Sequence, residues 1–146
     1  MRRTLATATP DVDHLTTRRR APMESNRPAD LFDNDPEALE RLRRFGGARL
    51  LSDMIALFLE ALPQRPSAAR AGAQRGDAPA VEHALHALKS SSAQLGAMRL
   101  HRLSVEGEQL AKAGTLDGVS GILDALDDEC ARVTSWLGSA NGGAGA

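Results

Sequence analysis

Apolar residues recur along most of this chain at intervals of three and four positions, the spacing of one face of an α-helix. The clearest case covers residues 78–94 and the residue after them, where a single serine interrupts an apolar stripe. The members of this stripe are Val81, Leu85, Leu88, Ser92 and Leu95. Residues 48–62 carry a broader apolar face, which indicates a helix with neighbours on two sides. Two further helices are predicted over 97–113 and from about 117 to 138.

Proline, glycine and aspartate mark where these helices begin and end. Asp35 followed by Pro36 predicts the N-cap and first residue of a short helix that stops at the glycine pair 46–47. Pro63 predicts a break after the 48–62 helix, and Asp77 predicts the N-cap of the next one. Short loops make successive helices antiparallel neighbours. The predicted fold is therefore all-α, an up-and-down antiparallel four-helix bundle with a short N-terminal capping helix.

The two ends of the chain lack this periodicity. Residues 1–30 hold isolated apolar positions among Arg, Thr, Pro and Asp, and we expect a disordered tail. Residues 139–146 read SANGGAGA and predict a flexible C-terminal tail. The helical bundle is thus expected to occupy residues 31–138.

Composition and charge narrow the class of protein. Aromatic residues make up only 3% of the chain, which favours helices built on aliphatic packing over a sheet protein. The formal net charge of −1 argues against a dedicated nucleic-acid binder. The single cysteine, Cys130, has no partner within the chain and fits a reducing compartment. No apolar run has the length of a signal peptide core or a membrane span. We expect a cytoplasmic monomer that binds neither membrane nor nucleic acid.

The segment HALKSSSAQLG, residues 86–96, carries the candidate chemistry. His86 follows Leu85, so it lies about 100° around the helix, beside the buried stripe and not within it. His86 and Lys89 share a helix face, and we expect both side chains to reach solvent. The residues around them are small. The members of this face are His86, Lys89, Ser90, Ala93 and Ala97.

The spacing resembles the motif of the histidine phosphotransfer (HPt) domain, roughly H-x-L-K-G/S-S/A-S/A-x-x-x-G. The matching residues are His86, Leu88, Lys89, Ser90, Ser91, Ser92 and Gly96. The resemblance implies that His86 accepts a phosphoryl group on the ring nitrogen farther from the backbone, and that Lys89 stabilises its charge. It also implies a hydrogen-bonding residue against the nearer nitrogen about 22 positions later. That position is Glu108, with Gln109 as the substitute if the register differs by one.

The resemblance also implies partners. The chain has no phosphate-binding glycine loop and no aspartate-rich magnesium site. The HPt resemblance therefore implies a phosphoryl carrier, not an enzyme, with no cofactor of its own. It would take the group from the aspartate of one receiver domain and pass it to another, the receiver supplying Mg²⁺. Docking is expected on the small face, including Ser90 and Ala93, and on exposed residues of the 48–62 helix such as Leu57 and Ala61.

Two other interpretations of the sequence remain open. The chain could be a helical adaptor or inhibitor that docks receiver domains without being phosphorylated. It could also be a metal-binding bundle in which His83, His86 and His101 converge with Glu108. Otherwise His83 is expected to be a spectator on the helix face and His101 a surface residue.

Overall fold

A computed structural model describes residues 33–145, with side chains described as far as Ala140. The predicted tail at residues 1–30 lies outside this range. All the elements are helices. They are α2 (Pro36–Ala61), α3 (Gln64–Gln74), α4 (Ala78–Gln94), α5 (Met98–Lys112), the short 3-10 helix η1 (Leu116–Gly118) and α6 (Val119–Gly145).

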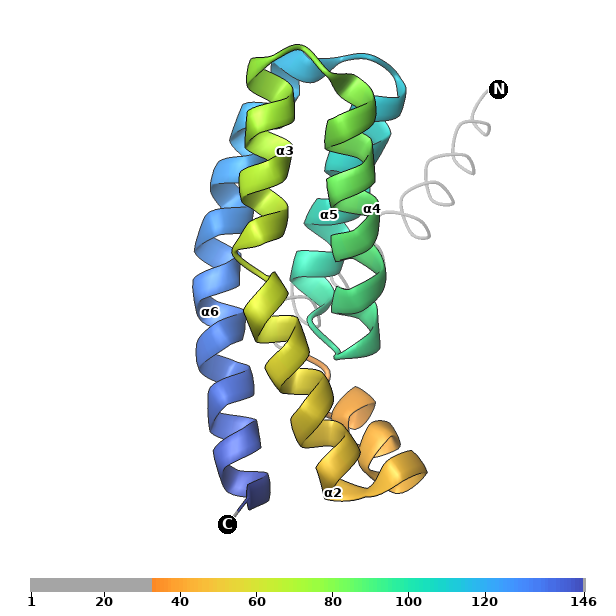
Figure 1. Cartoon of the computed structure of the whole chain (residues 1–146), viewed down its shortest axis with the longest axis vertical. Coiled ribbons are helices and arrows are strands. Elements are labelled where there is room, and N and C mark those ends of the chain that lie inside the picture. The colour runs from red at the N-terminus through yellow and green to blue at the C-terminus, as the bar shows by residue number, and fades with distance from the viewer. Residues whose placement is uncertain (1–32, 146) are drawn as a thin grey trace, which may run out of the picture. The chain divides into compact units, whose positions relative to one another are not determined.

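The helices form a four-helix bundle, as the sequence predicted. The first arm of the bundle consists of the second half of α2 followed by α3, with a break near Pro63. The helix α6 forms another arm and runs beside both α2 and α3 (Figure 1). The other two arms are α4 and α5, and α4 contacts both α3 and α5. Within the described part, no helix combines the length and the apolar content needed to cross a membrane.

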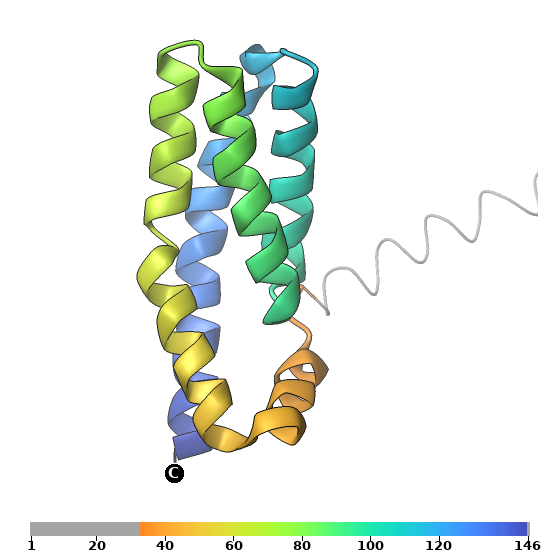
Figure 2. The same ribbon diagram turned by 45° about the vertical axis from the view of Figure 1, so that its right-hand side comes forward.

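The first part of α2 is the short capping helix that the sequence predicted. The Asp35 carboxylate accepts a hydrogen bond from the backbone N–H of Glu37 at 3.1 Å, and Pro36 follows it. Gly47 then adopts φ 86° and ψ 176°, a conformation that favours glycine, and interrupts the helix. Figure 2 shows a sharp turn between this first part and the second half of α2. Its residues Ala38 and Leu39 are buried.

Gly96, the last residue of the motif, ends α4 and holds the capping helix in place. Its φ of +81° is left-handed, so a side chain there would be strained, and a Cβ would collide with the carbonyl oxygen of Asp35. The backbone N–H of Asp35 donates to the Gly96 carbonyl at 2.7 Å. The turn also places Ala97 in the core, fully buried. The prediction that Ala97 belongs to the exposed face was therefore wrong, because α4 ends at Gln94 and the chain turns at Gly96 before it reaches Ala97.

The last helix is longer than the sequence predicted. It continues to Gly145 through the stretch that was expected to be a flexible tail after residue 138. Leu137 is buried in the core, and Trp136 and Ala140 pack against it. These contacts stabilise the helix past Gly138, where the glycine content alone predicted its end.

Cys130 lies in α6 as a half-buried packing residue. Burial raises the pKa of its thiol to about 12, and the neighbouring carboxylates of Asp127 and Glu129 add to the effect. The thiolate is the nucleophilic form of cysteine. Cys130 is therefore not a candidate nucleophile, which leaves the chemistry to the residues around His86.

Candidate functional site

His86 lies on α4 with 60% of its side chain exposed. Its neighbours on the inner face of the helix, Leu85 and Leu88, are fully buried. The imidazole thus lies at the edge of the bundle, where the sequence pattern placed it. A partner can approach the ring without any change in the packing of the core.

Glu108 on α5 is buried, with 3% of its side chain exposed, and it contacts His86. Its Oε2 lies 2.7 Å from Nδ1 of His86, across a separation of 22 residues in the sequence. Gln109, the alternative to Glu108, is exposed. The structure therefore brings together the pair that the HPt resemblance implied.

The charge state of Glu108 decides which ring nitrogen of His86 carries the proton. Burial acts to raise the pKa of Glu108, but hydrogen bonds from Lys89 and His86 and the charges of Lys89 and Lys112 outweigh it, so the pKa lies below its ordinary value of 4.5. An ionised carboxylate only accepts hydrogen bonds. Nδ1 must therefore donate, which leaves the lone pair of the uncharged ring on Nε2, the nitrogen farther from the backbone.

Two lysines share the Glu108 carboxylate. Lys89 Nζ lies 2.8 Å from Oε1, and Lys112 Nζ lies 3.6 Å from Oε2. The Lys89 side chain is only 27% exposed. We expected the ammonium group of Lys89 to point into solvent beside the imidazole. This prediction was wrong, because the buried carboxylate of Glu108 attracts the ammonium group toward the bundle. Lys112 was missed, although it lies four residues after Glu108 on the same face of α5.

His101 is another residue whose position differs from the prediction. It is half-buried, and its Nδ1 lies 3.0 Å from the backbone carbonyl oxygen of Lys89. This contact joins the start of α5 to α4 three residues beyond His86. His101 is thus part of the packing that supports the site, and the prediction of a surface residue was wrong. No sequence motif marks this contact.

The three serines of the motif keep the surface beside His86 small. Their hydroxyls donate back to carbonyl oxygens of α4 one turn earlier, at 3.3 Å for Ser90, 3.1 Å for Ser91 and 2.7 Å for Ser92. Ser90 is exposed, Ala93 is half-buried and Ser92 is buried. None of these side chains is long enough to cover the imidazole.

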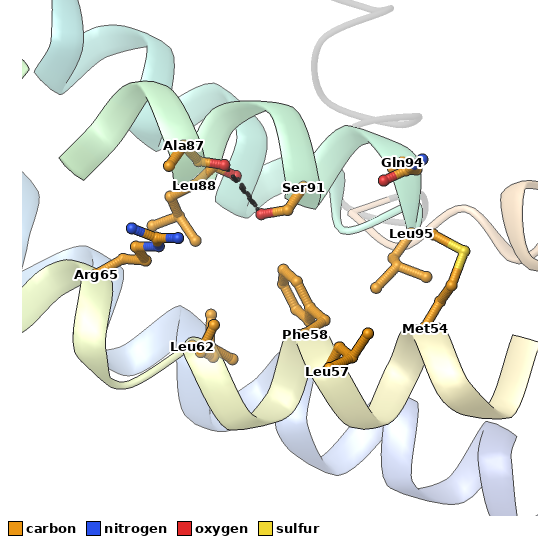
Figure 3. Close-up of a pocket in the computed structure, with 11 residues that line it drawn as sticks. Met54, Leu57, Phe58, Leu62, Arg65, Ala87, Leu88, Ser91, Gln94 and Leu95 are labelled. Atoms are coloured by element: carbon orange, nitrogen blue, oxygen red, sulfur yellow. Dashed lines mark hydrogen bonds between the residues drawn. The ribbon is translucent and has the colours of Figure 1, made fainter. Parts of the chain in front are cut away.

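An apolar groove opens between α2 and α4, on the other side of the motif from Glu108. Figure 3 shows Leu57 and Phe58 of α2 facing Ser91 and Leu95 of α4 across it. The cavity measures about 270 Å³, and Ala61 also lines it. Leu57 is 65% exposed, which is unusual for a large apolar residue. Leu57 and Ala61, the two α2 residues predicted for docking, thus line one groove beside α4, the helix that carries His86.

The structure does not support the metal-binding alternative. His83 is exposed and lines a shallow recess together with His86, Glu108 and Lys112. His101 is held instead by the Lys89 carbonyl. Among the residues whose side chains are described, no three His, Cys, Asp or Glu side chains are grouped closely enough to hold a metal ion.

A family model and a solved structure each match this chain. The profile of the Hpt domain matches residues 53–136. The crystal structure of histidine-containing phosphotransfer protein B (HptB) from Pseudomonas aeruginosa PAO1 is similar in fold, with a TM-score of 0.71 at 24% sequence identity. The similarity covers 75% of this chain and 94% of the HptB chain. No curated protein sequence matches the chain.

Proposed function

The chain belongs to the Hpt domain family and has a role in histidine phosphotransfer within phosphorelays, and from this premise we propose that it carries the phosphoryl group on Nε2 of His86. The observation that carries the proposal is the 2.7 Å contact between Nδ1 of His86 and the buried Glu108 carboxylate. This contact fixes the tautomer and directs the reactive lone pair outward. The exposure of the ring makes that lone pair accessible.

The transfer step requires no proton to leave the site. Nε2 attacks the phosphorus of a receiver's aspartyl phosphate, an N–P bond forms, and the P–O bond to the aspartate breaks, which releases its carboxylate. The imidazole gains a positive charge while Nδ1 keeps its proton, and the Glu108 carboxylate lies opposite that charge. In onward transfer an aspartate oxygen of the next receiver attacks phosphorus, the N–P bond breaks, and the ring becomes neutral again. We propose that Mg²⁺ arrives with the receiver.

Lys89 and Lys112 supply positive charge around the transferred group. Both are already within 3.6 Å of Glu108, so the carboxylate is balanced before phosphate arrives. The phosphoryl group brings about two further negative charges. We propose that Lys89, as the HPt resemblance implied, and the more exposed Lys112 stabilise this charge together.

Receiver domains are the partners of the Hpt family, and we propose that they dock on α2 and α4. The apolar groove with Leu57 and Ala61 is lined on α4 by Ala87 and Ser91, and Ala87 directly follows His86 in the sequence. Apolar area with few charges beside a reactive group fits a transient protein interface. The chain is proposed to act there as a monomer.

A transfer assay separates a carrier from a non-phosphorylated adaptor. We expect labelled phosphate to move from a phosphorylated receiver domain to this chain, and to form an acid-labile, alkali-stable linkage typical of phosphohistidine. A chain that binds the receiver in a pull-down but takes up no label would support the adaptor and contradict the proposal.

Leu57→Glu tests the docking surface. We expect it to weaken receiver binding and to slow phosphoryl uptake at limiting receiver concentration about tenfold or more, because a charge replaces an apolar contact at the groove. Phe45→Glu is the matched control. Phe45 is 86% exposed in the capping part of α2, before the break at Gly47, and does not line the groove. Equal losses in both variants, measured by titration with a receiver, would contradict the assignment of the groove.

A further inference from the structure

Gly107 lies in the interior of α5 and is buried. It immediately precedes Glu108, and the residue that it faces on α4, Leu85, immediately precedes His86. The buried contact of Gly107 with Leu85 therefore lies beside the contact of Glu108 with His86. Both contacts join α5 to α4, at adjacent positions of each helix.

In the present packing, a side chain at position 107 would overlap with Leu85. A Cβ atom built there would lie 2.5 Å from Cδ1 of Leu85 and 3.4 Å from Cγ2 of Ile122. Carbon atoms in contact prefer a separation of about 3.5–4.0 Å. Leu85 is fully buried, so its side chain is surrounded by packed neighbours, and a movement of Cδ1 disturbs that packing. A methyl group at position 107 must push α5 away from α4 or displace Leu85.

We infer that Gly107 is a positioning residue, whose missing side chain lets α5 come close enough for Glu108 to reach His86. Relieving the overlap with Leu85 requires a movement of about 1 Å. The same movement applied to the 2.7 Å contact between Nδ1 and Oε2 takes it beyond normal hydrogen-bond range. Gly107 thus acts through Glu108 on the tautomer of His86, an inference that rests on the proposed function.

Gly107→Ala tests this inference by two independent readouts. The first is the ¹⁵N chemical shifts of the His86 ring, which report the tautomer, and the second is the rate of phosphoryl uptake from a phosphorylated receiver. We expect the alanine variant to show mixed tautomers and uptake slowed about tenfold or more, since small misplacements of reacting groups carry large rate costs. Gly138→Ala is the matched control, because a Cβ at that exposed position in α6 meets no atom within 4 Å.

A second substitution keeps the test decisive if the alanine variant folds poorly. Leu85→Val removes the Cδ atoms that the new methyl group meets, so the double variant with Gly107→Ala should regain the Nδ1-protonated tautomer and an uptake rate near that of Leu85→Val alone. Unchanged ring signals in folded Gly107→Ala, or no recovery in the double variant, would overturn the inference. Because the ring signals need no phosphate, they test Gly107 even if the unaltered chain takes up no label.

Discussion

Replacing His86 with glutamine is expected to abolish phosphoryl uptake while the fold stays intact. The side chain is 60% exposed, so its loss removes little packing. Glutamine keeps a polar group near Glu108 but offers no nucleophilic ring nitrogen. Label transfer from a phosphorylated receiver should fall to background, and circular dichroism should show unchanged helicity.

His83→Gln is the matched control for this loss. His83 is exposed on the same helix, one turn earlier, and lines the same recess as His86. It has no hydrogen bond to Glu108 in the described contacts. Uptake should therefore be largely unchanged in the His83 variant. Equal loss in the two variants would refute the assignment of His86 as the carrier.

Glu108→Gln is expected to slow both uptake and onward transfer about 10- to 100-fold, by analogy with the loss of a partner that orients a metal-binding histidine. The amide keeps the shape of the side chain but removes the negative charge that balances Lys89, Lys112 and the phosphorylated ring. The free energy of unfolding should also fall by about 1.5–3 kcal/mol, because hydrogen bonds to a buried charge are lost. Stopped-flow transfer assays and urea titrations measure the two effects.

The same variant should change how stability depends on pH. The lowered pKa of Glu108 means that its contribution to stability is present above about pH 4.5 and is lost as pH falls through the folded-state value. Glu108→Gln should therefore lose less stability than the unaltered chain between pH 5 and pH 3. Glu106→Gln, an exposed position on the same helix, serves as the control. Identical acid profiles for the Glu106 and Glu108 variants would contradict the role of the buried carboxylate.

The helices could be predicted from the sequence because their signals are local. The caps at Asp35 and Asp77 and the apolar stripe of α4 each depend on residues within a few positions of one another. The glycine pair at 46–47 was likewise enough to locate the break in α2. The continuation of α6 beyond Gly138 could not be predicted in this way, because it involves the packing of Ala140 against a core built from residues far away in the sequence.

The site was predicted only as far as the HPt motif reached. The motif predicted His86 as the carrier, and the spacing of about 22 positions that the HPt resemblance implies predicted Glu108 as its partner. The position of the Lys89 ammonium group depends on the burial of Glu108, which the sequence pattern did not predict. The contact of His101 with the Lys89 carbonyl depends on how α5 packs on α4, and so does the close approach of Gly107 to Leu85.

The central claim is that one particular ring nitrogen carries the phosphoryl group. The most direct test is ³¹P and ¹⁵N NMR of the chain after transfer from a phosphorylated receiver, with the ring nitrogens of histidine labelled. We predict a phosphorus–nitrogen coupling at Nε2 of His86 and a retained proton on Nδ1. Coupling at Nδ1, or at a nitrogen of any other histidine, would contradict it.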